Sequence, residues 1–304
     1  IKDGFHMIET RLLEYFLIVA QEENITKASQ LLHISQPTLS RQMKQLETEV
    51  NQKLFIRSNH SIKLTEEGYL LRKRAREIIE LIDKTTKEVN AVKNIKKSNI
   101  NIGAAETVAL KYLLQALNNI KFKYGNIHIN MYSGNKEMIL EKLEKGLIDI
   151  AVIGDEIDTK KYHDFVIPHY DQWIVLMTRD HPLASKNRIT KEDLLKYPLI
   201  CSREGMEKKL FNYFKENYEK LNIVGTYDLL YNATLMVKEK IGIALAYDNI
   251  INTIGDTTIC KKNLSIPLTS INHIVVKKSD IITPLMERIL EEIDLTLSSI
   301  EYKH

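Results

Sequence analysis

The segment NITKASQLLHISQPTLSRQMKQLETE, residues 24–49, has the pattern of two short helices joined by a tight turn. Ser35 is a good N-cap for the second helix, and Pro37 falls in its first turn, where a missing amide costs nothing. Apolar residues then recur at helical spacing and predict one buried stripe, formed by Leu39, Met43, Leu46 and Val50.

The opposite face of this second helix is polar and carries Gln36, Thr38, Ser40, Arg41 and Lys44. Amide, hydroxyl and guanidinium groups are those that hydrogen-bond base edges and phosphates in the major groove of DNA. An ordinary amphipathic surface helix explains the same face equally well, because polar outer faces are the rule. The neighbouring segments must decide between a DNA-reading helix and a surface helix.

The flanking segments predict a small helical domain with a wing. A first helix is expected from Thr10 to Glu22, and the next, capped by Asn24, should pack against it. The residues expected at that contact are Ala28, Leu31 and Leu32. After Val50, the pattern KLFIRSNHSIKLTEEG predicts two short strands around a polar tip at residues 58–61.

Polar residues beside this tip could follow a DNA backbone or enter a minor groove: Arg57, Asn59, His60 and Lys63. For any single one of them a solvated loop residue is the simpler explanation. The distribution of charge supports DNA contact by these residues as a group. The stretch from Arg41 to Arg76 holds nine Lys or Arg against four Asp or Glu, while the net charge of the whole chain is only +3. A basic patch beside a candidate recognition helix is expected of a phosphate-contacting surface.

A long helix is expected from Thr65 to about Asn94. Its apolar positions alternate by four and three residues, as in a coiled coil, at Leu71, Ala75, Ile78, Ile82, Val89 and Val92, with Thr85 in the remaining slot. We expect this helix to join two copies of the chain, because a domain that recognises half of a DNA site binds the whole site more tightly as a dimer. The competing interpretation is a lone helix packed on its own domain.

From residue 99 onward, strand and helix patterns alternate, which is typical of a doubly wound α/β sheet. The expected strands are 99–104, 127–131, 147–153, 173–177, 199–201, 223–227, 241–246 and 271–277. The expected helices are 106–123, 136–145, 190–197, 208–218, 229–240 and one that starts at Thr283. This count favours two α/β lobes with a cleft between them over a single sheet.

The predicted fold class is therefore α/β and multidomain. A winged helix-turn-helix should occupy residues 7–65, a dimerising linker helix 66–97, and a two-lobed effector domain 98–304. Lobe one should comprise about 98–164 and 266–304, and lobe two about 165–265. Residues 1–6, IKDGFH, precede Met7 and are expected to be an expression remnant outside the fold.

In open α/β sheets, ligands bind outside the carboxyl ends of strands, near helix N-termini. This rule selects loops at Ala105, Glu106 and Thr107, at Ser133 and Asn135, at Ser202 and Arg203, and at Tyr247. Arg203 could pair with a carboxylate, whereas Glu106 favours an effector with amino or hydroxyl groups. Each residue taken singly is more often a helix cap than a ligand contact.

The sequence contains no motif for common enzymatic chemistry: no GxSxG, P-loop, HExxH, or GxGxxG after a strand. Asp149 is more simply a structural cap than a catalytic carboxylate, and Cys201 lacks a nearby Cys or His partner. Cys201 and Cys260 show no metal-ligand spacing. We expect no enzyme activity, cofactor or metal site, and, without a membrane span or leader, a cytoplasmic protein.

Several motifs resemble those of LysR-type transcriptional regulators. They are SQPTLSRQ at 35–42, LE at 46–47, LFIR at 54–57, LTEEG at 64–68 and, more weakly, GLIDIAVI at 146–153, HPLA at 181–184 and IGIALA at 241–246. The resemblance implies a winged helix-turn-helix, a dimerising linker helix and a two-lobed domain of periplasmic-binding-protein type. It further implies homotetramers that bend promoter DNA and change that bend when an effector occupies the cleft.

Carried over residue by residue, the resemblance places base contacts at Gln36, Pro37, Ser40 and Arg41, and effector contacts near Thr107, Asn135 and Ser202. Thr26 joins the predicted DNA contacts. Gln115 and Tyr247 depart from prolines frequent in the family, which bears on the shape of the cleft. The two cysteines lie too far apart in sequence to resemble a peroxide-sensing pair.

The predicted function is a sequence-specific DNA-binding transcriptional regulator modulated by a small effector, a carboxylate or an amino or hydroxy acid. Its expected partners are promoter DNA, RNA polymerase and further copies of the chain, as a homodimer and then a homotetramer. An architectural DNA-binding protein without an effector is the alternative, and an enzyme built on the two lobes is a more remote one.

Overall fold

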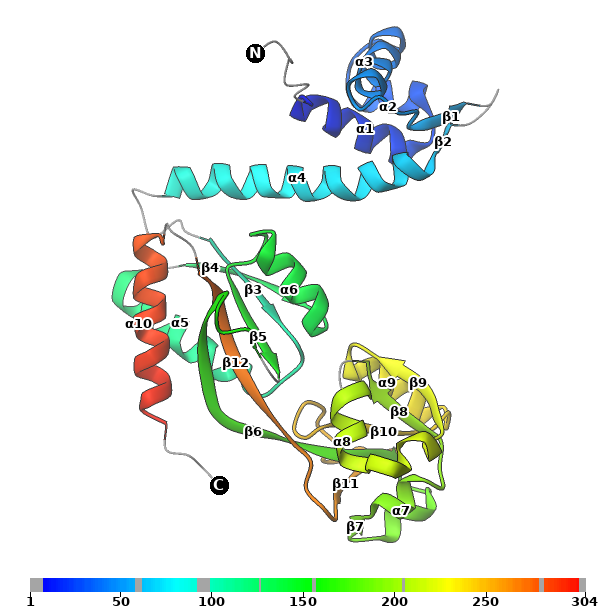
Figure 1. The fold of residues 1–304 in the computed structure, drawn as a ribbon, viewed down its shortest axis with the longest axis vertical. Coiled ribbons are helices and arrows are strands. Elements are labelled where there is room, and N and C mark those ends of the chain that lie inside the picture. The colour runs from blue at the N-terminus through cyan, green and yellow to red at the C-terminus, as the bar shows by residue number, and fades with distance from the viewer. Residues whose placement is uncertain are drawn as a thin grey trace. The chain divides into compact units, whose positions relative to one another are not determined.

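The computed structural model describes residues 8–57, 62–91, 99–125, 127–154, 157–203, 206–278 and 282–300. The chain divides into two compact units, residues 1–90 and 91–304, which are described separately (Figure 1). Within the described residues, no helix is long and apolar enough to cross a membrane. The predicted α/β multidomain class is confirmed by the element order.

Unit 1 begins with three helices that share one core: α1 (Thr10–Glu22), α2 (Ile25–Leu31) and α3 (Gln36–Glu49). Asn24 caps α2 and Ser35 caps α3, each through a side-chain oxygen that accepts a backbone amide, as predicted. Leu39, Met43 and Leu46 are fully buried. The half-buried Val50 is the C-cap of α3.

The predicted burial of Leu31 is wrong, because its side chain is 60% exposed. The buried face of α2 runs through Ile25, Ala28 and Ser29 and continues to the half-buried Leu32. At 100° per residue, position 31 points well away from that face.

The wing is an antiparallel pair, β1 (Phe55–Arg57) and β2 (Ile62–Leu64). Glu47, buried at the end of α3, accepts the amides of Leu54 at 3.0 Å and Phe55 at 3.4 Å, so a carboxylate joins helix to wing. Gly68 is required here, because a Cβ at this position would lie 2.3 Å from the carbonyl oxygen of Leu54. Through Glu47 and Gly68, the motifs LE (46–47) and LTEEG (64–68) thus help to hold the wing against the helices.

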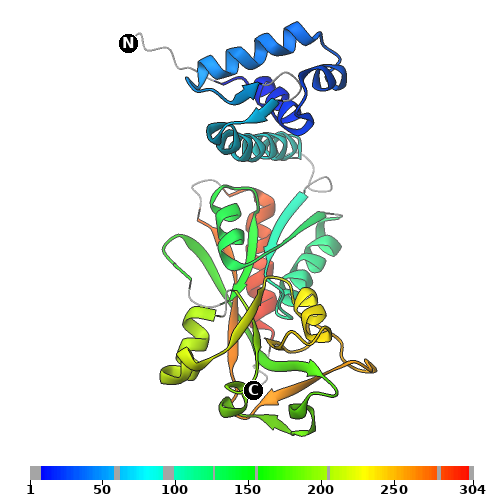
Figure 2. The same ribbon diagram turned by 90° about the vertical axis from the view of Figure 1, so that its right-hand side faces the viewer.

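The long helix α4 (Glu66–Ala91) lies beside the head helices, as Figure 2 shows. Its first part packs on the head core through the buried Ala75 and the half-buried Leu71. Further along, Ile78, Ile82 and Val89 are 40%, 40% and 67% exposed. The first stretch thus packs on its own domain, whereas dimerisation through the later stretch stays a prediction, and Val92 lies outside the described residues.

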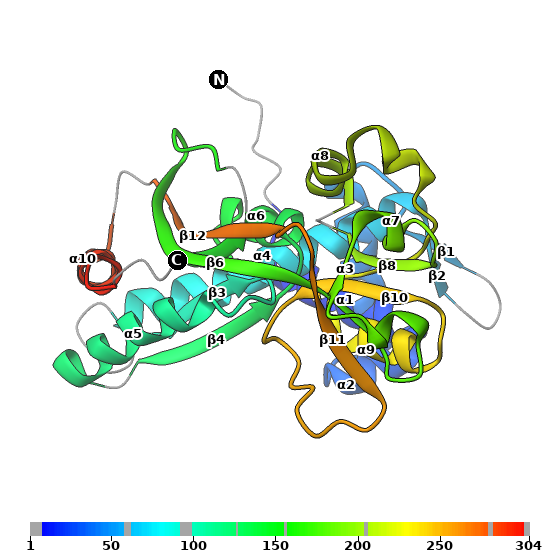
Figure 3. The same ribbon diagram turned by 90° about the horizontal axis from the view of Figure 1, so that it is seen from below.

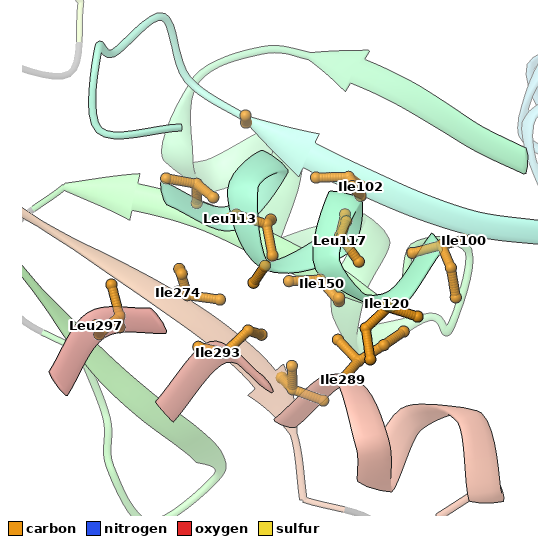
Figure 4. Close-up of a cluster of buried hydrophobic side chains, with 14 of the residues drawn as sticks. Ile100, Ile102, Leu113, Leu117, Ile120, Ile150, Ile274, Ile289, Ile293 and Leu297 are labelled. Carbon is orange, nitrogen blue, oxygen red and sulfur yellow. The ribbon is translucent and has the colours of Figure 1, made fainter. Parts of the chain in front are cut away.

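Unit 2 contains one continuous strand order, β4-β3-β5-β12-β6-β10-β8-β9. Lobe one is built on the parallel strands β3 (Asn99–Ala104), β4 (His128–Ser133) and β5 (Ile150–Gly154). Helices α5 (Leu110–Tyr124) and α10 (Pro284–Ser298) form one core with this sheet, shown in Figure 4, and α6 (Lys136–Glu144) forms another. Successive residues of β5 therefore face different cores, which explains its continuous apolar run.

Two long antiparallel strands run side by side between the lobes: β6 (Tyr162–Thr178) and β12 (Thr269–Lys277), seen from below in Figure 3. Lobe two adds the strands β7 (Arg188–Ile189), β8 (Leu199–Ser202), β9 (Ile223–Tyr227), β10 (Ile243–Tyr247) and β11 (Ile259–Leu264). Its helical segments are η2 (Pro182–Ser185), α7 (Lys191–Leu194), η3 (Met206–Leu210), α8 (Phe211–Phe214), η4 (Lys215–Lys220) and α9 (Leu230–Lys238).

The structure corrects several element predictions, and the helix predicted from Glu106 begins only at Leu110. The strand predicted at 173–177 extends back to Tyr162, because β12 pairs with residues 162–172. Strand β11 was missed, since its polar sequence CKKN has no strand pattern. The helix predicted at 208–218 is broken into η3, α8 and η4, with Lys215 at φ 51°.

Candidate functional site

The polar face of α3 is the first candidate site. Ser35 Oγ accepts the amide of Thr38 at 3.3 Å and lies 2.8 Å from the Thr38 hydroxyl, so local bonds hold this end of the helix. Ser40 is half-buried beside the core residue Leu39. The other predicted residues of this face are exposed: Gln36, Pro37, Thr38, Arg41 and Lys44.

The remaining predicted DNA contacts lie on α2 and the wing. Thr26 is exposed in the first turn of α2, and its carbonyl accepts the Ser29 hydroxyl at 2.8 Å. The backbone of Arg57 pairs with Ile62 at the end of β1. The Arg57 side chain, Asn59 and His60 lie outside the described residues.

The second candidate site, here called the cleft cavity, lies between the lobes of unit 2. Its lining is Ala105, Glu106, Gly134 and Asn135 from lobe one, and Trp173, Ser202, Tyr227, Asp228, Leu230, Tyr247 and Ile250 from lobe two. The cavity has a volume of about 50 Å³, so a ligand of more than a few atoms must separate the lobes to enter it. Five of the eight predicted effector residues thus meet in one cavity: Ala105, Glu106, Asn135, Ser202 and Tyr247.

Within the described part of the chain, hydrogen bonds cross this cavity from lobe to lobe. Glu106 Oε2 accepts the amide of Leu230, the first residue of α9, at 2.5 Å. Asn135 Nδ2 donates to Asp228 Oδ1 at 3.2 Å, while Asn135 Oδ1 caps α6 by accepting the amide of Met138. Both lobe-one residues follow strands, as the strand-end rule requires.

Three predicted effector residues are not part of the cavity lining. Thr107 is 7% exposed, donates its hydroxyl to Asp171 and accepts the amide of Ala109 at 2.9 Å, so its hydroxyl is engaged within the turn that precedes α5. Ser133 is exposed at the end of β4. Arg203 has a 63% exposed side chain, with Nη2 3.8 Å from Asp228 Oδ2.

The Thr107 hydroxyl belongs to a buried polar cluster where β6 passes between the lobes. Asp171 also accepts Asn272 Nδ2 at 3.0 Å and lies 3.3 Å from His169 Nε2. Asp171 and Asn272 are 3% and 1% exposed. This cluster joins the first loop of lobe one to both crossing strands.

The residues of the cavity that sequence reasoning missed are Gly134, Trp173, Tyr227, Asp228, Leu230 and Ile250. Asp228 directly follows β9, so the same strand-end rule would have found it. Trp173 starts the lobe-two part of β6, and its Nε1 donates to Ser270 Oγ at 3.1 Å. Since Ser270 comes from β12, that contact depends on the pairing of two distant strands.

The structure places two acidic or nucleophilic candidates in structural roles. Asp149 Oδ2 accepts the amide of Asn101 at 2.7 Å, which makes it a cap between strands. Burial raises the pKa of the Cys201 thiol to about 12, so this side chain stays protonated and unreactive near neutral pH. Among the described residues, no group of three or more His, Cys, Asp or Glu could hold a metal ion.

Comparison with known proteins identifies the family. The family model of bacterial regulatory helix-turn-helix proteins, lysR family, matches residues 10–69, and that of the LysR substrate binding domain matches residues 95–296. The HTH-type transcriptional regulator BsdA of Bacillus subtilis (strain 168) is 31% identical over 222 residues, which are 71% of this chain and 74% of that protein.

Two further proteins are similar to this chain over most of its length. A probable RuBisCO transcriptional regulator of Phaeodactylum tricornutum (strain CCAP 1055/1) is 29% identical over 217 residues, 70% of each chain. Full-length CbnR, solved in complex with its target DNA, superposes with a TM-score of 0.75 at 19% identity, covering 95% of this chain and 100% of that chain. With a helix-turn-helix head and a two-lobed domain that both match, the chain belongs to the LysR family, whose members are DNA-binding transcriptional regulators and not enzymes.

Proposed function

We propose that the cleft cavity binds a small effector and that this binding changes how the protein holds its promoter DNA. The observation that carries the proposal is the pair of lobe-to-lobe hydrogen bonds, Glu106 to Leu230 and Asn135 to Asp228, inside the cavity. A ligand that enters the cavity must replace or rearrange these contacts. It therefore has different affinities for different arrangements of the lobes, which is the requirement for a ligand-driven shift.

The DNA contacts that we propose are the exposed residues of α3 together with Thr26 and the wing. Arg41 suits a guanine edge, Gln36 an adenine edge, and Lys44 a phosphate. Ser40, which is half-buried, would make its contact only at the surface of the groove. The basic stretch from Arg41 to Arg76 supplies the sequence-independent attraction.

The proposed assembly is a homodimer through α4, and a homotetramer built from such dimers. The exposed apolar residues Ile78, Ile82 and Val89 support the dimer, since apolar surface of this kind is stabilised by a partner helix. A regulator that works at promoters in the cytoplasm would also meet RNA polymerase, which we include as a proposed partner.

The test begins with the DNA that the full chain binds in cells. Mapping these sites gives the operator, and the neighbouring genes suggest metabolites to try as effectors. A footprint of that operator should then change when one of these metabolites is added, and Ser202→Trp, which fills the cavity, should abolish the change. A footprint that no metabolite alters, together with no ligand-dependent thermal shift, would instead support an architectural DNA-binding protein.

A further inference from the structure

The walls of the cleft cavity favour a positively charged ligand. The lining includes the carboxylates of Glu106 and Asp228 and the rings of Trp173, Tyr227 and Tyr247, and within the described residues no lining side chain is a lysine or arginine. We propose that the effector is a small organic cation, an ammonium or guanidinium compound, held by Glu106 and Asp228. This inference rests on the proposed function, because it names the ligand class of the same cavity.

Three side-chain hydrogen-bond donors of the cavity are engaged within the protein. Asn135 Nδ2 donates to Asp228, Trp173 Nε1 to Ser270, and the Tyr227 hydroxyl to the carbonyl of Leu245 at 2.8 Å. An ionised carboxylate offers roughly four acceptor sites, so a single amide from Leu230 or Asn135 leaves acceptor capacity at Glu106 and at Asp228. A ligand rich in N–H donors complements this surplus.

One part of the cavity that would attract an anion is already filled by the protein. The N-terminus of α9 has the free amides and partial positive charge that bind anions, and the Glu106 carboxylate accepts its first amide. A ligand carboxylate would have to displace Glu106 and then lie near a second carboxylate at Asp228. A cation between the two side chains instead gains from both charges.

Aromatic rings complete the site. Trp173 and Tyr247 meet edge to face, with ring centroids 4.8 Å apart, and both rings line the cavity. Ring faces attract cations within about 6 Å of the centroid, and most strongly where water is excluded. An ammonium or guanidinium group that loses its hydration here therefore meets both carboxylates and aromatic rings among the lining residues.

Among the described residues, Arg203, Lys209 and Lys136 lie near the cavity without lining it. Arg203 lies 3.8 Å from Asp228 but is 63% exposed, so solvent screens most of this attraction. Lys209 donates to Ser270 Oγ, and Lys136 donates to the carbonyl of Gly154 at 3.0 Å. Because none of these three cations lines the cavity, Glu106 and Asp228 are the charged side chains among its described lining residues.

The test compares n-butylammonium, n-butanol and butyrate, which match in size and differ in charge, by calorimetric titration of the full chain. We expect n-butylammonium to bind more tightly than the other two. Glu106→Gln keeps an acceptor for Leu230, and Asp228→Asn keeps an acceptor for Asn135, so both variants should fold. Each should weaken n-butylammonium binding by about 10- to 100-fold, because each removes one charge-assisted contact.

The control is Glu291→Gln, which removes an exposed carboxylate of α10 and should leave the affinity unchanged. Butyrate binding that exceeds n-butylammonium binding would overturn the inference while leaving a cleft effector in place. Equal binding of the three compounds, or no binding of n-butylammonium, would also overturn it. The proposed function fails separately, if no ligand of any charge alters the operator footprint.

Discussion

Glu47 shows how one carboxylate can join two parts of the DNA-binding head. It is 7% exposed and accepts the amides of Leu54 and Phe55, which begin the wing. Glu47→Ala should lower the free energy of unfolding of the head by about 1–3 kcal/mol, because it leaves two buried amides unsatisfied. Hydrogen exchange of the Leu54 and Phe55 amides measures this directly. Glu14→Ala on the exposed face of α1 is the control, and equal exchange in the two variants would contradict the assignment.

Arg41 and Lys44 are predicted to play different roles, although both are exposed on α3. Arg41→Ala should cost about 1–3 kcal/mol on the operator and reduce discrimination against a scrambled sequence. Lys44→Ala should weaken binding to both sequences alike and make the salt dependence shallower by about one phosphate. Arg188→Ala, an exposed arginine of unit 2, is the control in these binding titrations. Equal losses on both sequences for both variants would refute base reading by Arg41.

At the residue level, sequence predicts what depends on near neighbours. The caps Asn24, Ser35 and Thr190 each bind an amide three residues ahead, so their chemistry is local. Thr107 was predicted as a ligand contact, yet its partner Asp171 is 64 residues away and could not be inferred. The same limit applies to Trp173, whose place in the cavity depends on β12.

At the element scale, α4 changes its role along its length. Ala75 packs into the head, whereas Ile82 and Val89 present apolar surface that a second copy would cover. Ile82→Lys should therefore dissociate the proposed dimer, observed as a halved mass in sedimentation equilibrium. Glu80→Lys makes a similar change at an exposed polar position and should leave the mass unchanged. An unaltered mass for Ile82→Lys would contradict dimerisation through this face.

The contact between α5 and α10 predicts a pH dependence. Lys123 holds the pKa of Glu292 below its ordinary value of 4.5, and Asn119 Nδ2 donates to the same carboxylate at 2.9 Å. Because the folded pKa is the lower one, this stabilisation is present above pH 4.5 and is lost as the pH falls through the folded value.

Glu292→Gln should consequently lower the free energy of unfolding of unit 2 at pH 7 by about 1 kcal/mol. This loss should be measurable as a lower melting temperature. The difference from the parent chain should shrink towards pH 3. Glu291→Gln, its exposed neighbour, should have no effect at either pH. A difference that persists at pH 3 would show that packing, and not the charge, is responsible.

Periodic elements were predictable, and elements defined by pairing were not. The helices α1, α3 and α10 and the strands β3, β5 and β9 follow apolar periodicity within a few residues. β11 carries Lys261, Lys262 and Asn263 in its middle and is a strand because it pairs with β6. The early part of β6 likewise depends on β12.

At the scale of the molecule, the two lobes of unit 2 share β6 and β12, and the buried Asp171 cluster lies on these strands. The cleft cavity draws Glu106 and Asn135 from one lobe and Ser202, Asp228 and Tyr247 from the other. Resemblance of the head motifs was sufficient to predict the family. The charged and aromatic side chains that line the cavity could not be predicted as a set, because they come together only when the two lobes pack against each other.

If the arrangement of the lobes controls the DNA contacts, a lobe-to-lobe disulfide should change these contacts without a known effector. The side-chain ends of Asn135 and Asp228 lie 3.2 Å apart across the cavity. A disulfide needs Cβ atoms about 3.8 Å apart, closer than in two side chains bonded end to end, so a bridge between Asn135→Cys and Asp228→Cys should hold the lobes in a more closed arrangement. Cys201 is buried, and each single cysteine variant serves as a control.

The decisive measurement is the footprint of the operator with the double variant, oxidised and reduced, in the same preparation. We predict that the bridge changes the length or the bend of the protected DNA, that reduction reverses the change, and that the single variants show none. Identical footprints in the oxidised and reduced states, with the bridge verified by mass spectrometry, would contradict control of DNA binding by the lobes.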